Sequence, residues 1–327
     1  MPEIISSPVP TVLKRSDALD DEKWKVLLRR IHNQRCTPFL GPETCFDFSI
    51  PAASVLAEEW ADEHNYPFED RKNLPRVAQF VAYKVLESVD AVKEELAYKF
   101  RGLKVPDFSH PDEPYRILAS LPLNVYINTH YFVFMSLALM SQYKEPQRVV
   151  CRWNDNDPSE HEPDLPAAYD PKPACPLVFH MFGHVGDPSS LVLTEDDYLD
   201  FVVRTSDKQD LIPQAVQSAM NNNSLLFFGY QPNDLDFRVI LRSLYRIWQY
   251  GPSRKGSSYT IQFIHVADNK PTPEQIAHLK EYCNRYCKDS MSIGVYWGST
   301  SGFMTELRQR WEEYRRAAPA LGGVPCQ

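Results

Sequence analysis

The chain has 327 residues, a formal net charge of −8 and a hydrophobic fraction of 43%. This apolar content can bury a sizeable core, which excludes a chain that is disordered throughout. The acidic balance argues against an extended basic surface, so we do not expect nucleic acid to be bound directly.

The opening residues, MPEIISSPVPTVLKR, lack the basic cluster and apolar core of a secretory signal. The longest apolar run, 131–140, is much shorter than the roughly 20 residues that a membrane span needs. The seven cysteines are an odd number without C-x-x-C spacing, which fits a reducing compartment. We therefore expect a cytoplasmic protein that contacts no membrane and holds no structural metal.

Residues 1–22 contain three prolines and no periodicity, so they are predicted to form a flexible arm. Apolar residues recur at helical spacing from Trp24 to Ile31, which predicts the first helix. We expect a single domain over residues 23–316 and a tail over residues 317–327.

Six short apolar runs have the length and character of buried strands. They are residues 36–41, 123–128, 176–182, 224–229, 259–265 and 292–297. Helical patterns lie between them, and strands that alternate with helices form a parallel sheet covered on both faces. The sequence therefore predicts an α/β, Rossmann-like fold with about six strands.

Three helical segments stand out by their spacing or their start signals. Apolar residues from Val77 to Leu96 predict one long helix, and those from Phe237 to Trp248 predict another. Thr272, followed by Pro-Glu-Gln, has the sequence of a capping box. Residues 46–122 carry helical patterns only, so we expect a small helical subdomain or lid there.

In open parallel sheets, ligands bind beyond the carboxyl ends of the strands. Each predicted strand is followed by glycine or small polar residues, as a dinucleotide crevice requires. The segments that follow the strands begin at Gly41, Asn128, Phe182, Gly229, Val266 and Gly298.

Several strings of these segments resemble a known family. They are CTPFLG, LPLNVYINTHYFVFM, CRWN, VFHMFGHVGDPSSLVLTEDDYLDF and SLLFFGYQPNDLDFRVIL. Together they resemble the sirtuin-like, or silent-information-regulator-like, domains of bacterial anti-phage defence proteins, over residues 24–311. The resemblance implies a domain that hydrolyses NAD, with depletion of NAD stopping the infected cell.

The resemblance also implies where NAD would lie. The positions that would contact the cofactor are Gly41, Thr44, Gly183, Gly229, Asp234 and Ser299. If the protein is active, His130 and His180 would replace the usual catalytic pair. Asp234 has a second interpretation, as an N-cap of the helix that follows it.

The chain departs from the family pattern at three strand ends. Where the family has Gly-Ala-Gly, this sequence has Gly41-Pro42-Glu43, which removes one N–H donor and places a carboxylate opposite an anionic ligand. His130 and Phe132 stand where the family has asparagine and aspartate, and Phe182 stands where it has histidine. All of these changes oppose binding or cleavage of a dinucleotide.

We therefore expect a sirtuin-like protein with a degenerate NAD site that acts as an assembly, sensing or nucleotide-binding component. An alternative is an active NAD glycohydrolase that uses the substituted histidines. A third is a hydrolase that binds a metal through His130, His180 and His184. The resemblance implies a homo-oligomer or a hetero-complex with a defence partner.

Overall fold

The computed structural model describes residues 19–42, 44, 53–101, 103–154, 165–166, 169–207, 211–230, 237–240, 242, 258–262, 272–291 and 293–317. Most of the predicted arm and nearly all of the predicted tail lie outside these residues. Helix α1 (Asp21–His32) begins inside the predicted arm, because the Asp20 carboxylate caps it by accepting the Lys23 N–H at 2.8 Å.

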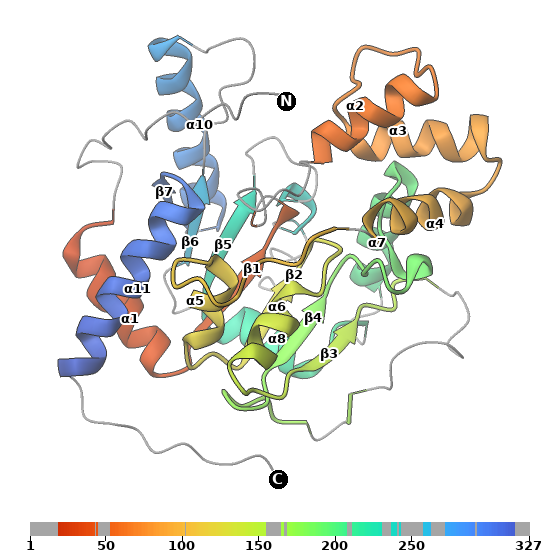
Figure 1. Cartoon of the computed structure of the whole chain (residues 1–327). Helices are drawn as coiled ribbons and strands as arrows, with labels where there is room; N and C mark the ends of the chain where they lie inside the picture. The colour runs from red at the N-terminus through yellow and green to blue at the C-terminus, as the bar shows by residue number, and fades with distance from the viewer. Residues whose placement is uncertain are drawn as a thin grey trace, which may run out of the picture.

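A seven-stranded sheet forms the centre of the molecule (Figure 1). The strands are β1 (Cys36–Leu40), β2 (Val125–Asn128), β3 (Gln147–Val150), β4 (Leu177–His180), β5 (Ser224–Tyr230), β6 (Ser258–Gln262) and β7 (Ile293–Trp297). Their order is β3-β4-β2-β1-β5-β6-β7, and every neighbouring pair is parallel. The predicted α/β, Rossmann-like fold is confirmed.

Six of these strands correspond to the predicted apolar runs. The exception is β3, which has four partly exposed residues and lies at the edge of the sheet beside β4. A short, half-exposed edge strand lacks the continuous apolar run that marks a buried one, so the sequence pattern missed it. The end of the fifth predicted strand, after residue 262, lies outside the described residues.

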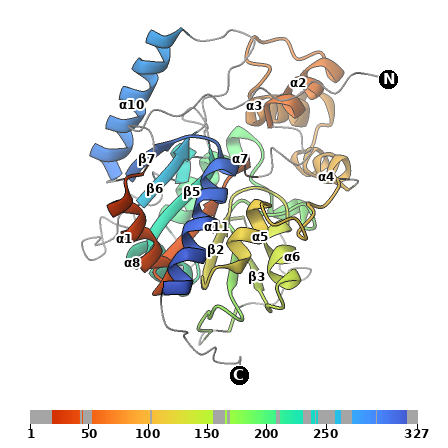
Figure 2. The same cartoon turned by 60° about the vertical axis from the view of Figure 1, so that its left-hand side comes forward.

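Helices cover both faces of the sheet (Figures 1 and 2). One face packs against α1, α5 (Pro114–Ser120), α6 (Phe134–Ser141) and α11 (Thr300–Ala317). The other packs against α7 (Glu195–Asp207) and α8 (Gln214–Asn222), while α10 (Pro273–Met291) lies beside β7. In the part of the chain that the structure describes, no helix has both the length and the apolar character to cross a bilayer.

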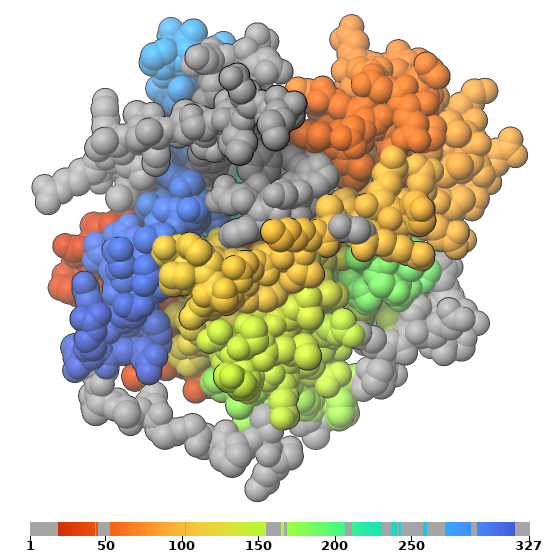
Figure 3. All heavy atoms as spheres, in the orientation of Figure 1, coloured from red at the N-terminus to blue at the C-terminus, as the bar shows by residue number. Residues whose placement is uncertain are grey.

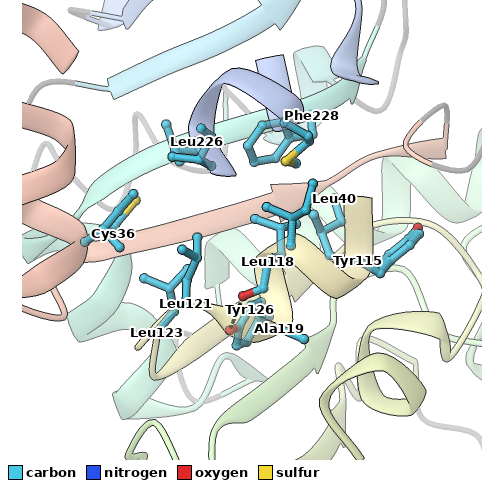
Figure 4. Close-up of a cluster of buried hydrophobic side chains, with 14 of the residues drawn as sticks. Cys36, Leu40, Tyr115, Leu118, Ala119, Leu121, Leu123, Tyr126, Leu226 and Phe228 are labelled. Atoms are coloured by element: carbon cyan, nitrogen blue, oxygen red, sulfur yellow. Dashed lines mark hydrogen bonds between the residues drawn. The ribbon is translucent and has the colours of Figure 1, made fainter. Parts of the chain in front are cut away.

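The central strands β1, β2, β4 and β5 are buried throughout, which explains their continuous apolar runs. Residues two apart share a face, so Cys36 and Leu40 of β1 point to the α5 side with Leu226 and Phe228 of β5 (Figure 4). Phe39 points the other way and meets Phe227 at a ring separation of 4.8 Å. Both faces are therefore closed by side chains that water does not reach.

The predicted capping box at α10 is present. The Gln275 N–H donates to the Thr272 hydroxyl, and the Gln275 side chain accepts the Thr272 N–H in return. Helix α7 starts in the same way, because the Asp197 N–H donates to the Thr194 hydroxyl and the Asp197 carboxylate accepts the Thr194 N–H. Local sequence thus sets both helix starts.

Helices α2 (Ala53–Glu63), α3 (Leu74–Phe80), the π-helix η2 (Val81–Val85) and α4 (Val89–Phe100) form what we call the helical lobe. Its apolar core around Trp60, Val77 and Leu96 also includes Leu191 and Leu193 from outside the lobe, and the lobe projects at the upper right of the space-filling view (Figure 3). Helix α5, which the sequence grouped with this subdomain, packs instead in the core beside the sheet.

The prediction of one long helix from Val77 to Leu96 is wrong. The chain breaks after η2, where Glu87 adopts a φ of 51°, and Ser88 caps α4 by accepting the Ala91 N–H at 3.2 Å. Both helices turn their apolar residues to the same lobe core, so the apolar spacing continues across the break. Periodicity alone therefore concealed it.

A buried ion pair joins the helical lobe to the rest of the protein. Lys93 of α4 contacts Asp197 of α7 at 2.9 Å, and their side chains are only 3% and 8% exposed. The Lys93 ammonium also lies 5.1 Å from the centre of the Trp153 ring. Removing one member of such a pair leaves the other charge buried alone, which makes the contact an anchor for the lobe.

Candidate functional site

The predicted crevice lies at the carboxyl ends of β1, β2, β4 and β5. At the end of β1, the Gly41 N–H donates to the Phe228 carbonyl at 2.8 Å. A Cβ atom on Gly41 would lie 2.6 Å from the Gly229 carbonyl oxygen and 2.7 Å from the Tyr230 ring. The close approach of β5 therefore requires glycine at this position, independently of any role in binding a phosphate.

Tyr230 fills the space above the end of β1. Its side chain is 1% exposed, and its hydroxyl lies 2.7 Å from the Thr129 hydroxyl. Because Thr129 donates its own proton to the Leu40 carbonyl, Tyr230 donates to Thr129. The Tyr230 ring also stacks on Phe237 at 5.2 Å. These contacts hold the ends of β1, β2 and β5 together.

Thr44 and Gly229 take part in the same closure. The Thr44 hydroxyl donates to the Phe228 carbonyl at 3.2 Å, and its N–H donates to the Gly41 carbonyl at 3.1 Å. Gly229 has a φ of 69°, a conformation that glycine adopts without strain. Three of the predicted cofactor contacts, Gly41, Thr44 and Gly229, therefore come together, and they contact one another and β5.

His130, in the turn after β2, is 2% exposed and uses both ring nitrogens. Its Nδ1 accepts the Phe132 N–H at 3.1 Å, so in the neutral ring Nε2 carries the proton and donates to the Tyr115 hydroxyl at 3.0 Å. Burial lowers the pKa of His130 to about 3. It is a neutral, fully bonded side chain at physiological pH.

Phe132 belongs to an aromatic cluster beside His130. Its ring stacks on Phe134 at 5.0 Å and meets Phe100 of the lobe edge-on at 5.0 Å. The position that the family resemblance assigns to an aspartate therefore holds α6 and the helical lobe against the sheet. A phenyl ring there offers no hydrogen bond to a ribose.

His180, the last residue of β4, contrasts with His130. It is fully buried, and within the described residues neither of its ring nitrogens has a hydrogen-bond partner. The neighbouring Asn128, its partner in the β2–β4 register, also has an unpaired side-chain oxygen among these residues. Burial, reinforced by His184, His130 and Arg148, lowers the pKa of His180 well below its usual range.

The turn after β4 contains the other predicted residues of this strand end. Phe182 is buried, and its ring meets Tyr198 and Phe201 of α7 edge-on at 5.4 and 5.1 Å. Gly183 has a φ of 79°, and a Cβ atom there would collide with the Ser190 carbonyl. The shape of this turn therefore depends on glycine at 183.

His184 lies next to His180, with 5.3 Å between ring centres. Its Nδ1 accepts the Gly186 N–H at 3.0 Å. The structure thus brings together His180 and His184 of the proposed histidine trio, while His130 makes hydrogen bonds of its own. Three converging ligands from this trio would require His130 to give up a hydrogen bond.

Two predicted contacts remain. Ser299 follows β7, two strands beyond β5, and its hydroxyl accepts the Gly302 N–H at 3.0 Å to cap α11. Asp234 and Glu43 both lie outside the described residues. The expectation that the Glu43 carboxylate opposes an anionic ligand therefore remains a prediction.

Sequence reasoning missed two features of this region. Tyr230 stands inside the string that carried the family resemblance, but only the fold places its ring over Gly41. The unpaired oxygen of Asn128 was equally invisible, because it depends on which groups face it across the sheet. A cavity of about 1010 Å³ between α8 and β3 contains none of the predicted site residues among its described lining.

The parallel sheet, with its polar groups at the carboxyl ends of the strands, defines a Rossmann-like α/β protein. Within that class, residues 124–286 match the SIR2-like domain family. This match agrees with the resemblance found in the sequence.

Two relatives are both named NAD(+) hydrolase ThsA. The protein of Enterococcus faecium is 27% identical over 132 residues, which are 40% of this chain and 24% of that protein. The protein of Cytobacillus dafuensis is 24% identical over 220 residues, which are 66% of this chain and 39% of that protein. The chain thus spans well under half the length of the relatives that it matches.

Proposed function

We propose that this SIR2-like chain is an assembly, sensing or nucleotide-binding component of bacterial anti-phage defence, with little or no NAD hydrolysis. The observation that carries the proposal is the closed crevice, in which the buried Tyr230 ring lies over Gly41 and donates to Thr129. We further propose that it acts in the cytoplasm.

Energetics support this proposal. A diphosphate at Gly41 would have to displace Tyr230, which costs a buried hydrogen bond and the burial of a large aromatic surface. At the positions of the family's aspartate and histidine, Phe132 and Phe182 are packed in apolar clusters. Losing one preorganised polar group commonly costs about 10²–10³ in rate, so two such losses leave little chemistry.

The test uses purified full-length protein with a fluorogenic NAD analogue, and calorimetry with NAD and ADP-ribose. We expect no turnover above background and no NAD binding tighter than millimolar. Tyr230→Ala should then bind NAD or ADP-ribose more tightly than the parent protein, because it opens the crevice. Turnover by the parent protein at the level of a ThsA enzyme assayed in parallel would overturn the proposal.

A second candidate function is an active NAD glycohydrolase. The observation in its favour is His180, whose two buried ring nitrogens have no partner among the described residues and could bond a ribose hydroxyl if the crevice opened. Its low pKa keeps the ring neutral at physiological pH, so one ring nitrogen can accept a hydrogen bond, but the same low pKa makes it a weak base. If the protein is an active glycohydrolase, His180→Ala abolishes NAD turnover. If the crevice is inactive, the parent and His180→Ala both show only background turnover.

We also propose that the protein assembles, either with itself or with a defence partner. Large apolar side chains on the surface support this, among them Leu199 and Val203, which are 65% and 58% exposed and one turn apart on α7. Light scattering of the pure protein tests self-association, and a monomer at all concentrations would leave only the hetero-complex.

A further inference from the structure

A second group of polar side chains lies in the helical lobe, away from the crevice. Glu63 is the last residue of α2, His64 follows it directly, and Glu95 lies on helix α4. Each offers one ligand atom, and these three atoms all lie within 4.8 Å of one another. Two carboxylates and an imidazole from two helices thus converge on a single point.

The spacing fits a shared ion better than a hydrogen bond. His64 Nε2 lies 3.7 Å from a Glu95 carboxylate oxygen, which is beyond the reach of a good N–H···O bond. Two ligands of a tetrahedral Zn²⁺, each about 2.1 Å from the metal, lie about 3.4 Å apart. His64 Nε2 is shielded from solvent and has no hydrogen-bond partner in the described part of the chain.

The local electrostatics favour a cation at this point. Two carboxylates meet the C-terminal end of α2, where the helix dipole is negative. Lys99 contacts Glu63 Oε2 at 2.9 Å and offsets part of this negative charge, but the ion pair leaves the second oxygen of Glu63 available. The Lys99 ammonium also lies 5.9 Å from the centre of the Trp60 ring, so it has a second attractive contact.

We propose that Glu63, His64 and Glu95 bind one divalent transition-metal ion, for which Zn²⁺ is the best match. One imidazole and two carboxylates are ligands that Zn²⁺ accepts, and they leave a fourth position for water. The ion would fasten the end of α2 to α4, and α4 also carries Lys93, the anchor to α7. This site runs against the expectation from sequence that the chain holds no structural metal.

The test is a zinc titration of the full-length protein after treatment with EDTA, in competition with a chromogenic chelator. We expect one equivalent of Zn²⁺ to bind in the micromolar range or tighter. His64→Ala and Glu95→Gln should each weaken binding at least about tenfold, because each removes a ligand. Glu94→Gln is the matched control, since Glu94 is exposed on the same helix beside Glu95 and should bind as the parent does.

Thermal unfolding provides the second readout. Zn²⁺ should raise the Tm of the parent protein and of Glu94→Gln, but not that of Glu95→Gln. Melting in EDTA shows that each variant is folded, and if His64→Ala is not, Glu95→Gln decides alone. The proposal is overturned if the parent binds no zinc, or if folded Glu95→Gln binds it as tightly as the parent.

Discussion

The carboxyl ends of β2 and β4 lie side by side, yet the buried histidines found there differ in their hydrogen bonding. His130 after β2 has both ring nitrogens bonded, to Phe132 and Tyr115. His180 at the end of β4 has neither nitrogen bonded within the described residues. An unpaired buried polar group costs about 1–3 kcal/mol, so His130 is explained by stability and His180 is not. The second turn is therefore where function should be sought.

The largest effect should come from breaking the turn after β4. Gly183→Ala forces a side chain into a φ of 79° and against the Ser190 carbonyl. Left-handed strain of about 1–2 kcal/mol and overpacking of about 1–3 kcal/mol together predict a loss of about 4 kcal/mol. Urea unfolding measures it.

Gly302→Ala is the control for this substitution. A Cβ atom there would lie 3.0 Å from the Ser299 hydroxyl, which can rotate away, and Gly302 lies in the first turn of α11. We expect a change below about 1 kcal/mol. Equal losses for the two alanine variants would show that the turn after β4 is not specially constrained.

The next effect concerns the turn after β2. His130→Phe removes the hydrogen bonds that His130 makes with the Phe132 N–H and the Tyr115 hydroxyl, so we expect a loss of about 3 kcal/mol at pH 8. A double-mutant cycle with Tyr115→Phe should recover part of this loss. Complete additivity of the two substitutions would contradict the hydrogen bond between these side chains.

The same variant tests a dependence on pH. The pKa of His130 is about 3 in the folded protein, whereas an unfolded histidine titrates near 6.5. The unfolded chain therefore binds more protons below pH 6.5, and the parent loses stability as the pH falls from there toward 3. Between pH 6.5 and 4.5 this loss is about 2 kcal/mol, and His130→Phe should lack it.

A smaller effect is expected at Glu113, which caps the start of α5 close to Tyr115. Burial raises the pKa of this carboxyl to about 7, so the folded state holds a proton that the unfolded state has released. Its contribution to stability is lost as the pH rises from about 4.3 through 7. Glu113→Gln should be about 2 kcal/mol more stable than the parent at pH 8.

At pH 4 and below the two proteins should unfold alike, because the carboxyl is then mostly protonated in both the folded and the unfolded state. Glutamine retains an oxygen that can accept the Arg116 N–H, as Glu113 does. A gain of the same size at both pH values would assign the effect to packing and not to ionisation.

The smallest effect should come from His180, and it should have the opposite sign to that of His130. His180→Phe removes two unpaired nitrogens from the core, so we expect a gain of about 1 kcal/mol in guanidinium unfolding. A loss as large as that of His130→Phe would mean that His180 has a partner and that the contrast between the two turns does not hold.

Much of the fold could be predicted from the sequence. The apolar run at 224–229 predicted β5 with an error of one residue, because a strand buried on both faces must be apolar throughout. The break between η2 and α4 could not be predicted, because both segments face the same lobe core. Edge strand β3 was hidden for the opposite reason, since it is only half buried.

The sequence by itself determined the parallel α/β architecture, the helix caps and the glycines at the strand ends, because these depend on local spacing and backbone freedom. Only the tertiary structure decided that the Tyr230 ring closes over Gly41, that His130 is bonded and His180 is not, and that Glu63, His64 and Glu95 converge. Those outcomes depend on distances between groups that are remote in the chain, which packing alone sets.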